Sequence, residues 1–408
     1  MSSVKAVIPN KKYVYLDYAA STPIDPHVLK SMFLVFKQFY GNTMSLHRKG
    51  MEAKELLENI RESFAKIMKV ASCELIFTAS ATESNNFALK GIVMANQKFG
   101  KHVITSTQEH SSIKSTALWL DKHSFKVSKI NTLNDGLIDL EDLKKQINDE
   151  TILVTLIYVN NETGVIQPLE KVGEIIQEVR EDRKKRGILA PIYFHTDATQ
   201  AFGKFVIDIQ KLNCDLFTAC SHKIYGPKGA ALLYIKKGVN IEPLLNGGGH
   251  ESGMRSSTVN VPAIFGFFKA FELCQGVMKK DYKKLTSLSD KLIKELPKVV
   301  SGSHFNVSKN IRIPNTINVR FDYIEGESLV YLLDNENIGV STGSACASSY
   351  LAASDTLTAM GLKPEEAAGS IRISVGRFTT KEEINYFLKV LPKVIKQLRD
   401  VSLFGKKS

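Results

Sequence analysis

Cysteine is scarce in this chain of 408 residues, and the few cysteines are scattered. The five are odd in number, and no two of them have C-x-x-C spacing. A disulfide framework and a structural zinc site both depend on such pairs, so the sequence predicts neither, and we expect no metal. A chain without a disulfide framework fits a reducing compartment, and we expect the cytoplasm. The cysteines are Cys73, Cys214, Cys220, Cys274 and Cys346.

Long apolar runs are also absent, and we find no uninterrupted run that would span a bilayer. The first residues, M-S-S-V-K-A-V-I-P-N-K-K, lack the apolar segment of a secretory signal, so we expect no membrane partner. Hydrophobic residues make up 43% and charged residues 24%, which is typical of a soluble globular protein. A chain of this length favours two domains over one compact core.

Acidic residues are fewer than basic ones, 42 against 54, which gives a net charge of +12. The basic residues are spread along the chain, and the densest cluster, R-E-D-R-K-K-R at 180–186, has no aromatic residues for base stacking. This pattern favours a solvated helix end, with an anionic protein or RNA partner as the second interpretation. We therefore do not expect nucleic acid as the main partner.

Apolar strands alternate with amphipathic helices through the first 240 residues. The helices include one that begins at Asp25-Pro26, one at about 50–68 and one at 169–186. This alternation predicts an α/β fold with a mainly parallel sheet that is covered on both faces. The predicted strands are 74–78, 102–107, 125–130, 152–159, 192–195, 215–219 and 230–235.

The pattern changes after Leu245. One helix is predicted from Val261 towards Met278 and a second over 282–296, and three isolated strands follow at 316–321, 339–341 and 370–374. This arrangement predicts a second, smaller α/β domain. We place the large domain at 15–260, and the small domain, which carries Cys346, at 1–14 and 261–408.

Polar side chains lie at or just beyond the carboxyl ends of the predicted strands. In open α/β sheets ligands bind at this edge. Any one of these residues alone fits a loop polar group without a role, but six at equivalent positions indicate a binding site. The six are Thr82, His110, Asn161, Asp197, Gln200 and Lys223.

Lys223 follows an apolar strand, where an ammonium is costly unless it is paired or loses its charge. It loses the charge by forming a Schiff base with an aldehyde cofactor such as pyridoxal phosphate (PLP). Asp197 would then face the pyridine nitrogen and His110 would stack on the ring. Thr82, at a helix N-terminus, would hold the phosphate. A lone lysine would instead be a solvated loop residue.

Cys346 lies within S-T-G-S-A-C-A-S-S-Y at 341–350, a run of small polar residues typical of a loop. Cys274 and Cys214 have apolar neighbours, as buried structural cysteines do. A thiol in a loop is accessible, and basic groups nearby lower its pKa and make it a nucleophile. An incidental loop cysteine fits the spacing equally well.

Eight stretches together resemble the NifS/IscS-type cysteine desulfurases, in order and over nearly the whole chain. They are Y-L-D-Y-A-A-S-T-P (15–23), F-T-A-S-A-T-E-S-N-N (77–86), V-N-N-E-T-G-V-I-Q (159–167), H-T-D-A-T-Q (195–200), S-H-K-I-Y-G-P-K-G (221–229), G-G-G-H-E-S-G-M-R-S-S-T (247–258), T-G-S-A-C-A-S (342–348) and S-I-R-I-S-V-G-R-F-T-T (370–380).

The resemblance implies a homodimeric fold-type-I PLP enzyme that takes sulfur from L-cysteine and releases L-alanine. It implies that Lys223 carries the cofactor, that Asp197 faces the ring nitrogen, and that His110 stacks on the ring and moves protons. It implies that Cys346 accepts the sulfur as a persulfide and passes it to an iron–sulfur scaffold or a tRNA-thiolating enzyme. The remaining implied contacts are Gln200 and Asn161 on the ring-oxygen side, Arg372 with Asn161 on the substrate carboxylate, and Ala81, Thr82, Cys220, Ser221, His222 and Thr258 on the phosphate, with Thr258 supplied across the dimer.

The chain departs from the family pattern at a few motif positions. Ser80, Ser221 and Ser257 replace usual glycines, and Cys220 replaces a usual serine. If a glycine there needed a positive φ, serine would cost on the order of 1 kcal/mol, whereas the added hydroxyls would instead tighten the phosphate site. The chain also ends at Ser408, short of the tail that docks the scaffold in housekeeping members. A selenocysteine lyase or another PLP lyase, and a non-catalytic binding paralogue, stay as alternatives.

Overall fold

The computed structural model describes residues 13–342 and 353–401. Its main feature is a seven-stranded sheet with the strand order β2-β8-β7-β6-β5-β3-β4. The strands β7, β6, β5, β3 and β4 are parallel, and β8 runs antiparallel to both of its neighbours. The strands are β2 (Leu75–Thr78), β3 (His102–Ser106), β4 (Lys126–Ile130), β5 (Thr151–Ile157), β6 (Tyr193–Asp197), β7 (Leu216–Cys220) and β8 (Ala231–Ile235).

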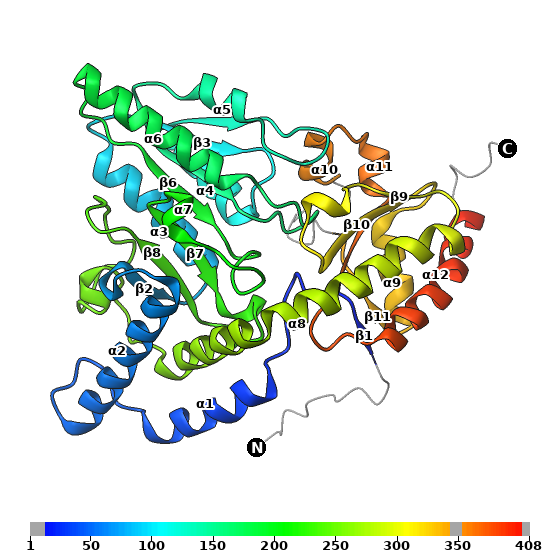
Figure 1. Ribbon diagram of the computed structural model, residues 1–408, viewed down its shortest axis with the longest axis horizontal. Coiled ribbons are helices and arrows are strands. Elements are labelled where there is room, and N and C mark those ends of the chain that lie inside the picture. Colours follow the sequence, from blue (N-terminus) through cyan, green and yellow to red (C-terminus); the bar gives the residue numbers. More distant parts are fainter. Residues whose placement is uncertain (1–12, 343–352, 402–408) are drawn as a thin grey trace.

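Helices cover both faces of this sheet, as the alternating pattern predicts (Figure 1). Ile76 and Phe77, neighbours on β2, point to opposite faces and enter different cores. The core that holds Ile76 includes α3 (Ala81–Asn96) and α4 (Ser111–Lys122). The core that holds Phe77 includes α1 (Pro26–Gln38), α2 (Arg48–Met68), α5 (Leu140–Gln146), α6 (Leu169–Arg186), α7 (Ile209–Leu212) and the first half of α8 (Val261–Val299).

A second layer of structure gathers around a separate core of residues from 14 to 16 and from 288 onwards. Its three-stranded antiparallel sheet has the order β12-β10-β9, and a short parallel pair joins β1 to β11. The domain boundaries at residues 15 and 260 stay a prediction. Tyr15, predicted to begin the large domain, pairs with Gly339 of the second part of the structure. The elements are β1 (Val14–Tyr15), β9 (Ser303–Phe305), β10 (Thr316–Phe321), β11 (Ile338–Gly339), β12 (Ser370–Ser374), α9 (Gly326–Asn335) and α12 (Lys381–Val401). The short helices α10 (Asp355–Ala359) and α11 (Pro364–Ala368) pack in a small separate cluster with Val165 and Val307.

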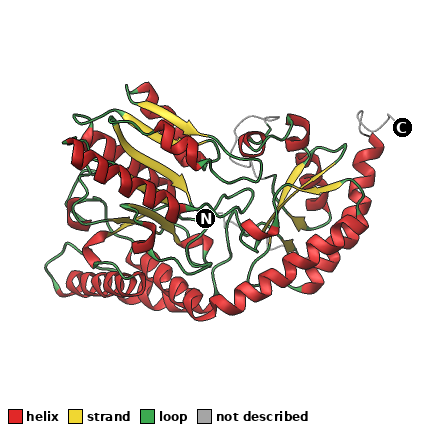
Figure 2. Ribbon diagram, turned by 45° about the horizontal axis from the view of Figure 1, so that its top comes forward, coloured by secondary structure: helices red, strands yellow, loops and turns green. Residues whose placement is uncertain are grey.

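The prediction of two helices between 261 and 296 is wrong, because α8 is one continuous helix that runs along both cores (Figure 2). The polar residues 279–281 lie on it without a break, since Lys and Asp are compatible with a helix when no proline interrupts it. By length and composition alone α8 would suit a membrane crossing, but half of its most apolar stretch is buried inside the protein. Its apolar residues therefore serve the core.

The strand directions place the candidate site. Because β8 is antiparallel to both β2 and β7, strand β2 points the same way as the parallel strands. The carboxyl ends of six strands therefore lie along one edge of the sheet, and the segments that follow them meet there.

Candidate active site

The six polar residues predicted to lie at strand ends are all found along this edge. Thr82 is the second residue of α3, after β2, and His110 caps α4, after β3. Asn161 follows β5, and Asp197 is the last residue of β6. Lys223 ends the 3-10 helix η2 (Ser221–Lys223), which follows β7, and Gln200 lies in the turn after β6.

Lys223 points its amine at the segment that follows β1. Its Nζ donates to the carbonyl oxygens of Ala19 and Ala20, both at 2.7 Å. Burial lowers the pKa of this amine, and the Arg372 guanidinium lowers it further, while Cys220, Asp17 and Asp197 act in the other direction. A lowered pKa increases the share of neutral amine, which is the form that attacks an aldehyde carbon.

Asp197 is buried, and its carboxylate is held from two sides. The side-chain amide of Asn85, on α3, donates to Oδ2 at 2.7 Å, and the Thr199 N–H donates to Oδ1 at 3.0 Å. Asn85 also donates to Ser112 Oγ at 2.9 Å, which joins α3 to α4. We did not single out Asn85 from the sequence, although a polar residue on the buried face of a helix is a usable signal.

His110 caps α4 with its ring. Its Nδ1 lies 3.2 Å from the Ser112 N–H and 2.9 Å from the Ser112 hydroxyl. Because a backbone N–H only donates, Nδ1 must accept, and a neutral ring then carries its proton on Nε2. Burial lowers the pKa of His110, and Lys223 and Lys114 lower it too, against the opposite effect of Asp197. The neutral imidazole is therefore favoured.

The residues predicted to line a phosphate group lie in two places at this edge. Ala81 and Thr82 form the first turn of α3, whose N–H groups point towards the edge. Ser221 is fully buried, and its Oγ has no hydrogen-bond partner among the described residues. A buried hydroxyl without a partner is a donor that a bound anion would satisfy.

Cys220 and His222 flank Ser221. Burial raises the pKa of the Cys220 thiol to about 12, so this cysteine stays neutral. The His222 ring lies 3.3 Å from Ser21 Oγ, and burial lowers its pKa to about 4, so it too is neutral near pH 7. Both residues therefore bring polar contacts rather than charge.

The serines that replace family glycines carry no backbone strain. None of Ser80, Ser221 and Ser257 has a positive φ. Ser80 is extended at φ −161°, and its Oγ accepts the Glu83 N–H at 3.1 Å as the N-cap of α3. The expected cost of a left-handed serine is thus ruled out.

Thr258 is exposed, in the segment between η3 (Glu251–Gly253) and α8. A buried ion pair fixes the start of this segment, because the Arg61 guanidinium holds both Glu251 oxygens at 2.7 and 2.8 Å. Glu251 Oε2 also accepts the Phe77 N–H on β2. No local pattern in the sequence predicts this pairing across 190 residues.

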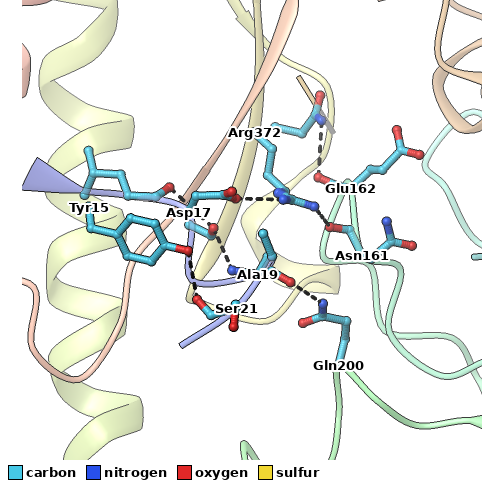
Figure 3. A network of polar contacts seen from close by, with 12 residues as sticks. Tyr15, Asp17, Ala19, Ser21, Asn161, Glu162, Gln200 and Arg372 are labelled. Atoms are coloured by element: carbon cyan, nitrogen blue, oxygen red, sulfur yellow. Dashed lines mark hydrogen bonds and ion pairs between the residues drawn. The ribbon is translucent and has the colours of Figure 1, made fainter. Parts of the chain in front are cut away.

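Arg372, on β12, points towards Asp17 and Asn161 (Figure 3). Its guanidinium donates to Asp17 Oδ1 and to the Asn161 carbonyl oxygen, both at 2.7 Å. Its Nε is buried and has no partner among the described residues. One donor of a forked cation is therefore available to a carboxylate, which is the role that the resemblance implies for Arg372.

Two further ionisable groups at this edge were not predicted from the sequence: Glu109, which is buried, and Lys204, which is half-buried. Glu109 Oε1 accepts the Ser106 hydroxyl at 2.5 Å and the Ile157 N–H at 3.0 Å. Burial raises the pKa of Glu109 to about 8. Lys204 donates to Gln200, and burial lowers its pKa to about 7. Glu109 is adjacent to His110 in the sequence and Lys204 lies four positions after Gln200, but their burial depends on the fold.

Cys346 lies outside the described residues. Among the described cysteines, Cys214, Cys220 and Cys274 are buried, and burial raises the pKa of each thiol. Cys73 is exposed and lies in η1 (Ser72–Glu74), ahead of β2. Within residues 13–342 and 353–401 no group of three His, Cys, Asp or Glu side chains is arranged to hold a metal.

The chain matches the aminotransferase class-V family over residues 14–387. The cysteine desulfurase IscS of Dictyoglomus turgidum is 42% identical over 392 residues, which cover 96% of this chain and 97% of that protein. The IscS of Methanosarcina thermophila is 40% identical over 97% of this chain and 95% of its own length.

Solved structures agree with these relatives. A NifS-like protein superposes with a TM-score of 0.86 at 36% identity, covering 95% of this chain and all of that one. The NifS-like protein of Rickettsia africae gives a TM-score of 0.82 at 32% identity, covering 94% of this chain and all of that one. The chain therefore belongs to the class-V aminotransferases, a family of fold-type-I PLP enzymes. Within that family it belongs with the NifS/IscS-type cysteine desulfurases.

Proposed function

We propose that this protein is a PLP-dependent cysteine desulfurase that converts L-cysteine into L-alanine and leaves the sulfur as a persulfide on Cys346. The observation that carries the proposal is the half-buried Lys223 amine with its lowered pKa, at the same sheet edge as the Asp197 carboxylate. Relatives of more than 40% identity that bear the name cysteine desulfurase support the choice of reaction.

The described residues fit PLP. The amine of Lys223, whose pKa is lowered, suits the aldehyde, the Asn85-held carboxylate of Asp197 suits a protonated pyridine nitrogen, and the orphaned hydroxyl of Ser221 suits a phosphate oxygen. When bound, PLP supplies an electron sink for the substrate α-carbon. The residues proposed to hold it are Lys223, Asp197, His110, Gln200, Asn161, Ala81, Thr82, Cys220, Ser221, His222 and Thr258 of the partner subunit.

The chain's own groups then divide the remaining work. Arg372 would bind the substrate carboxylate through its unpartnered Nε, beside Asn161. Lys223, once displaced by the substrate amine, would take the α-proton, and His110 would move protons at Nε2. The Cys346 thiolate would bond to the substrate sulfur, the Cβ–S bond would break, and Cβ would gain a proton, so cysteine and the enzyme thiol give alanine and the enzyme persulfide.

We further infer a homodimer, a cytoplasmic location and an acceptor protein for the persulfide sulfur, either an iron–sulfur scaffold or a tRNA-thiolating enzyme. The resemblance to the NifS/IscS-type cysteine desulfurases supports these three inferences.

The decisive experiment measures alanine and sulfide formed from L-cysteine with dithiothreitol by the wild type, Cys346→Ser and Cys73→Ser. Cys73 is exposed and outside the site, so Cys73→Ser controls for the loss of a thiol. We expect Cys346→Ser to lose activity at least a hundredfold while it keeps the visible, borohydride-sensitive absorbance of bound PLP. Full activity in that variant would refute the desulfurase mechanism, and selenocysteine as substrate would then be the next assay.

A further inference from the structure

Lys204 contacts one of the proposed cofactor residues directly. Its Nζ donates to Gln200 Oε1 at 2.7 Å. On the opposite side of the same amide, Gln200 Nε2 donates to the Ala19 carbonyl oxygen at 2.8 Å (Figure 3). The Gln200 side chain is thus held at both ends.

These two contacts specify one orientation of the amide. Lys204 Nζ donates to the Gln200 oxygen, and the protonated form of Lys204 requires that oxygen because an ammonium has donors and no acceptor. A carbonyl oxygen only accepts, so the atom that faces Ala19 must be the nitrogen. The two partners therefore agree, and the Gln200 NH₂ group is directed to the Ala19 side.

The Ala19 side is also where Lys223 lies, because the Lys223 Nζ donates to the same Ala19 carbonyl at 2.7 Å. An NH₂ group carries two N–H donors, and Ala19 takes one of them. The second donor is directed to the neighbourhood of Lys223, where an acceptor on a cofactor bound to that lysine would meet it.

A tight turn places Lys204 back against Gln200. Residues 198–204 form the turn, and the Ala201 and Phe202 N–H groups both donate to the Ala198 carbonyl. Gly203 within it has φ +71°, and a Cβ there would lie 2.9 Å from Ile224 Cγ2. Glycine is thus needed for both reasons, and Lys204 directly follows it.

The position of Lys204 is costly for a lysine. Burial is the main cause that lowers its pKa to about 7, and the nearby cations Lys223 and Arg372 lower it too, against Cys220 and Cys274. A cavity of about 40 Å³ has both Lys204 and Lys223 in its lining. A methionine of similar shape would pack there without the cost of removing an ammonium from water. The presence of an amine at this position therefore indicates a function for it.

We propose that Lys204 is a positioning residue that acts through Gln200 and keeps its NH₂ group directed at the PLP ring oxygen. The inference rests on the proposed function, since it requires PLP on Lys223. Without Lys204, only the Ala19 carbonyl holds the amide in this orientation, and a half-turn would present its oxygen to the electron-rich ring oxygen and repel it.

The test is a double-mutant cycle on the full-length protein with Lys204→Met, Gln200→Ala and the double variant. Two quantities are measured for each: the dissociation constant of PLP from cofactor-stripped protein, and the pH at which the visible band of bound PLP changes. Lys211→Met, on the exposed side of α7, is the matched control.

We expect Lys204→Met to weaken PLP binding about tenfold and to shift the pH of the spectral change, as loss of a charged hydrogen bond does. In the Gln200→Ala background the same substitution should change binding less than about twofold. Additive effects, or wild-type values in Lys204→Met, would overturn the proposal. Lys204→Ala replaces Lys204→Met in the cycle should the latter fail to fold. A wild type that shows no PLP band would instead refute the proposed function. The two failures are distinguishable, because the role of Lys204 is judged from differences between variants and the proposed function from the wild type alone.

Discussion

Glu109 makes the stability of this protein depend on pH in an unusual direction. The carboxyl group is 3% exposed, and burial is the main cause that raises its pKa from 4.5 to about 8, with Asp197 adding to it and its two hydrogen bonds and Lys114 opposing it. A group whose pKa is higher in the folded chain binds its proton more tightly when folded. Its stabilising contribution is therefore complete below pH 4.5 and is lost as the pH rises to about 8.

The magnitude follows from the two pKa values. Each pKa unit corresponds to 1.36 kcal/mol, so the difference between 4.5 and about 8 sets an upper limit of roughly 5 kcal/mol. Across the middle of this window the free energy of unfolding should fall by about 1.4 kcal/mol per pH unit because of Glu109 alone.

Glu109→Gln removes this term, since an amide does not titrate near neutral pH. Its side-chain oxygen still accepts from Ser106 and Ile157, while its NH₂ group takes the place of Oε2, which has no partner among the described residues. The variant therefore carries a fixed cost that does not vary with pH. The difference from the wild type should shift in its favour from pH 5 to pH 8, by an amount on the order of several kcal/mol.

The assay is urea unfolding at half-unit steps from pH 5 to pH 8.5, followed by the fluorescence of the single tryptophan, Trp119. Trp119 lies on α4, the helix that begins directly after Glu109 and His110. Glu55→Gln, on an exposed position of α2, is the control for removal of a carboxylate. Stability curves for Glu109→Gln and the wild type that run parallel across this range would refute the reasoning.

Three further substitutions test the contacts that build the site. Arg61→Ala leaves the buried Glu251 carboxylate without its cation and should cost about 3–5 kcal/mol in unfolding experiments, the usual magnitude for a broken buried pair. Adding Glu251→Ala to this variant should cost less than Arg61→Ala itself, because no unpaired charge then remains. Asn85→Ala removes the 2.7 Å contact to Asp197 and should weaken PLP retention about tenfold in dialysis, with a stability cost of about 1–3 kcal/mol from the buried groups that it leaves unpaired. Phe64→Ala removes a ring that packs against Phe267 and Phe271 of α8 and should cost about 3–5 kcal/mol by urea unfolding. A cost below about 1 kcal/mol would show that the core refills the space.

Much of the fold follows from local features of the chain. Asp25 before Pro26 marks the start of α1, and the structure confirms it as the N-cap. The direction of β8 was also open to inference, because only ten residues separate it from β7 and a parallel crossover needs a dozen or more. The continuity of α8 was not, since its polar stretch at 279–281 suits both a helix and a loop.

The ends of apolar strands and the residue types that follow them are encoded locally, so the sequence alone determined that Lys223, Asp197 and His110 stand along one sheet edge. The partners of these residues are not local. Asp17 meets Arg372 across 355 positions and Asn85 meets Asp197 across 112. Even Lys204, four positions from Gln200, reaches it only because the turn at 198–204 contains Gly203 in the left-handed conformation. Tertiary structure decided these contacts and the pKa shifts that accompany them, because burial and hydrogen bonding depend on which distant segments the folded core brings together.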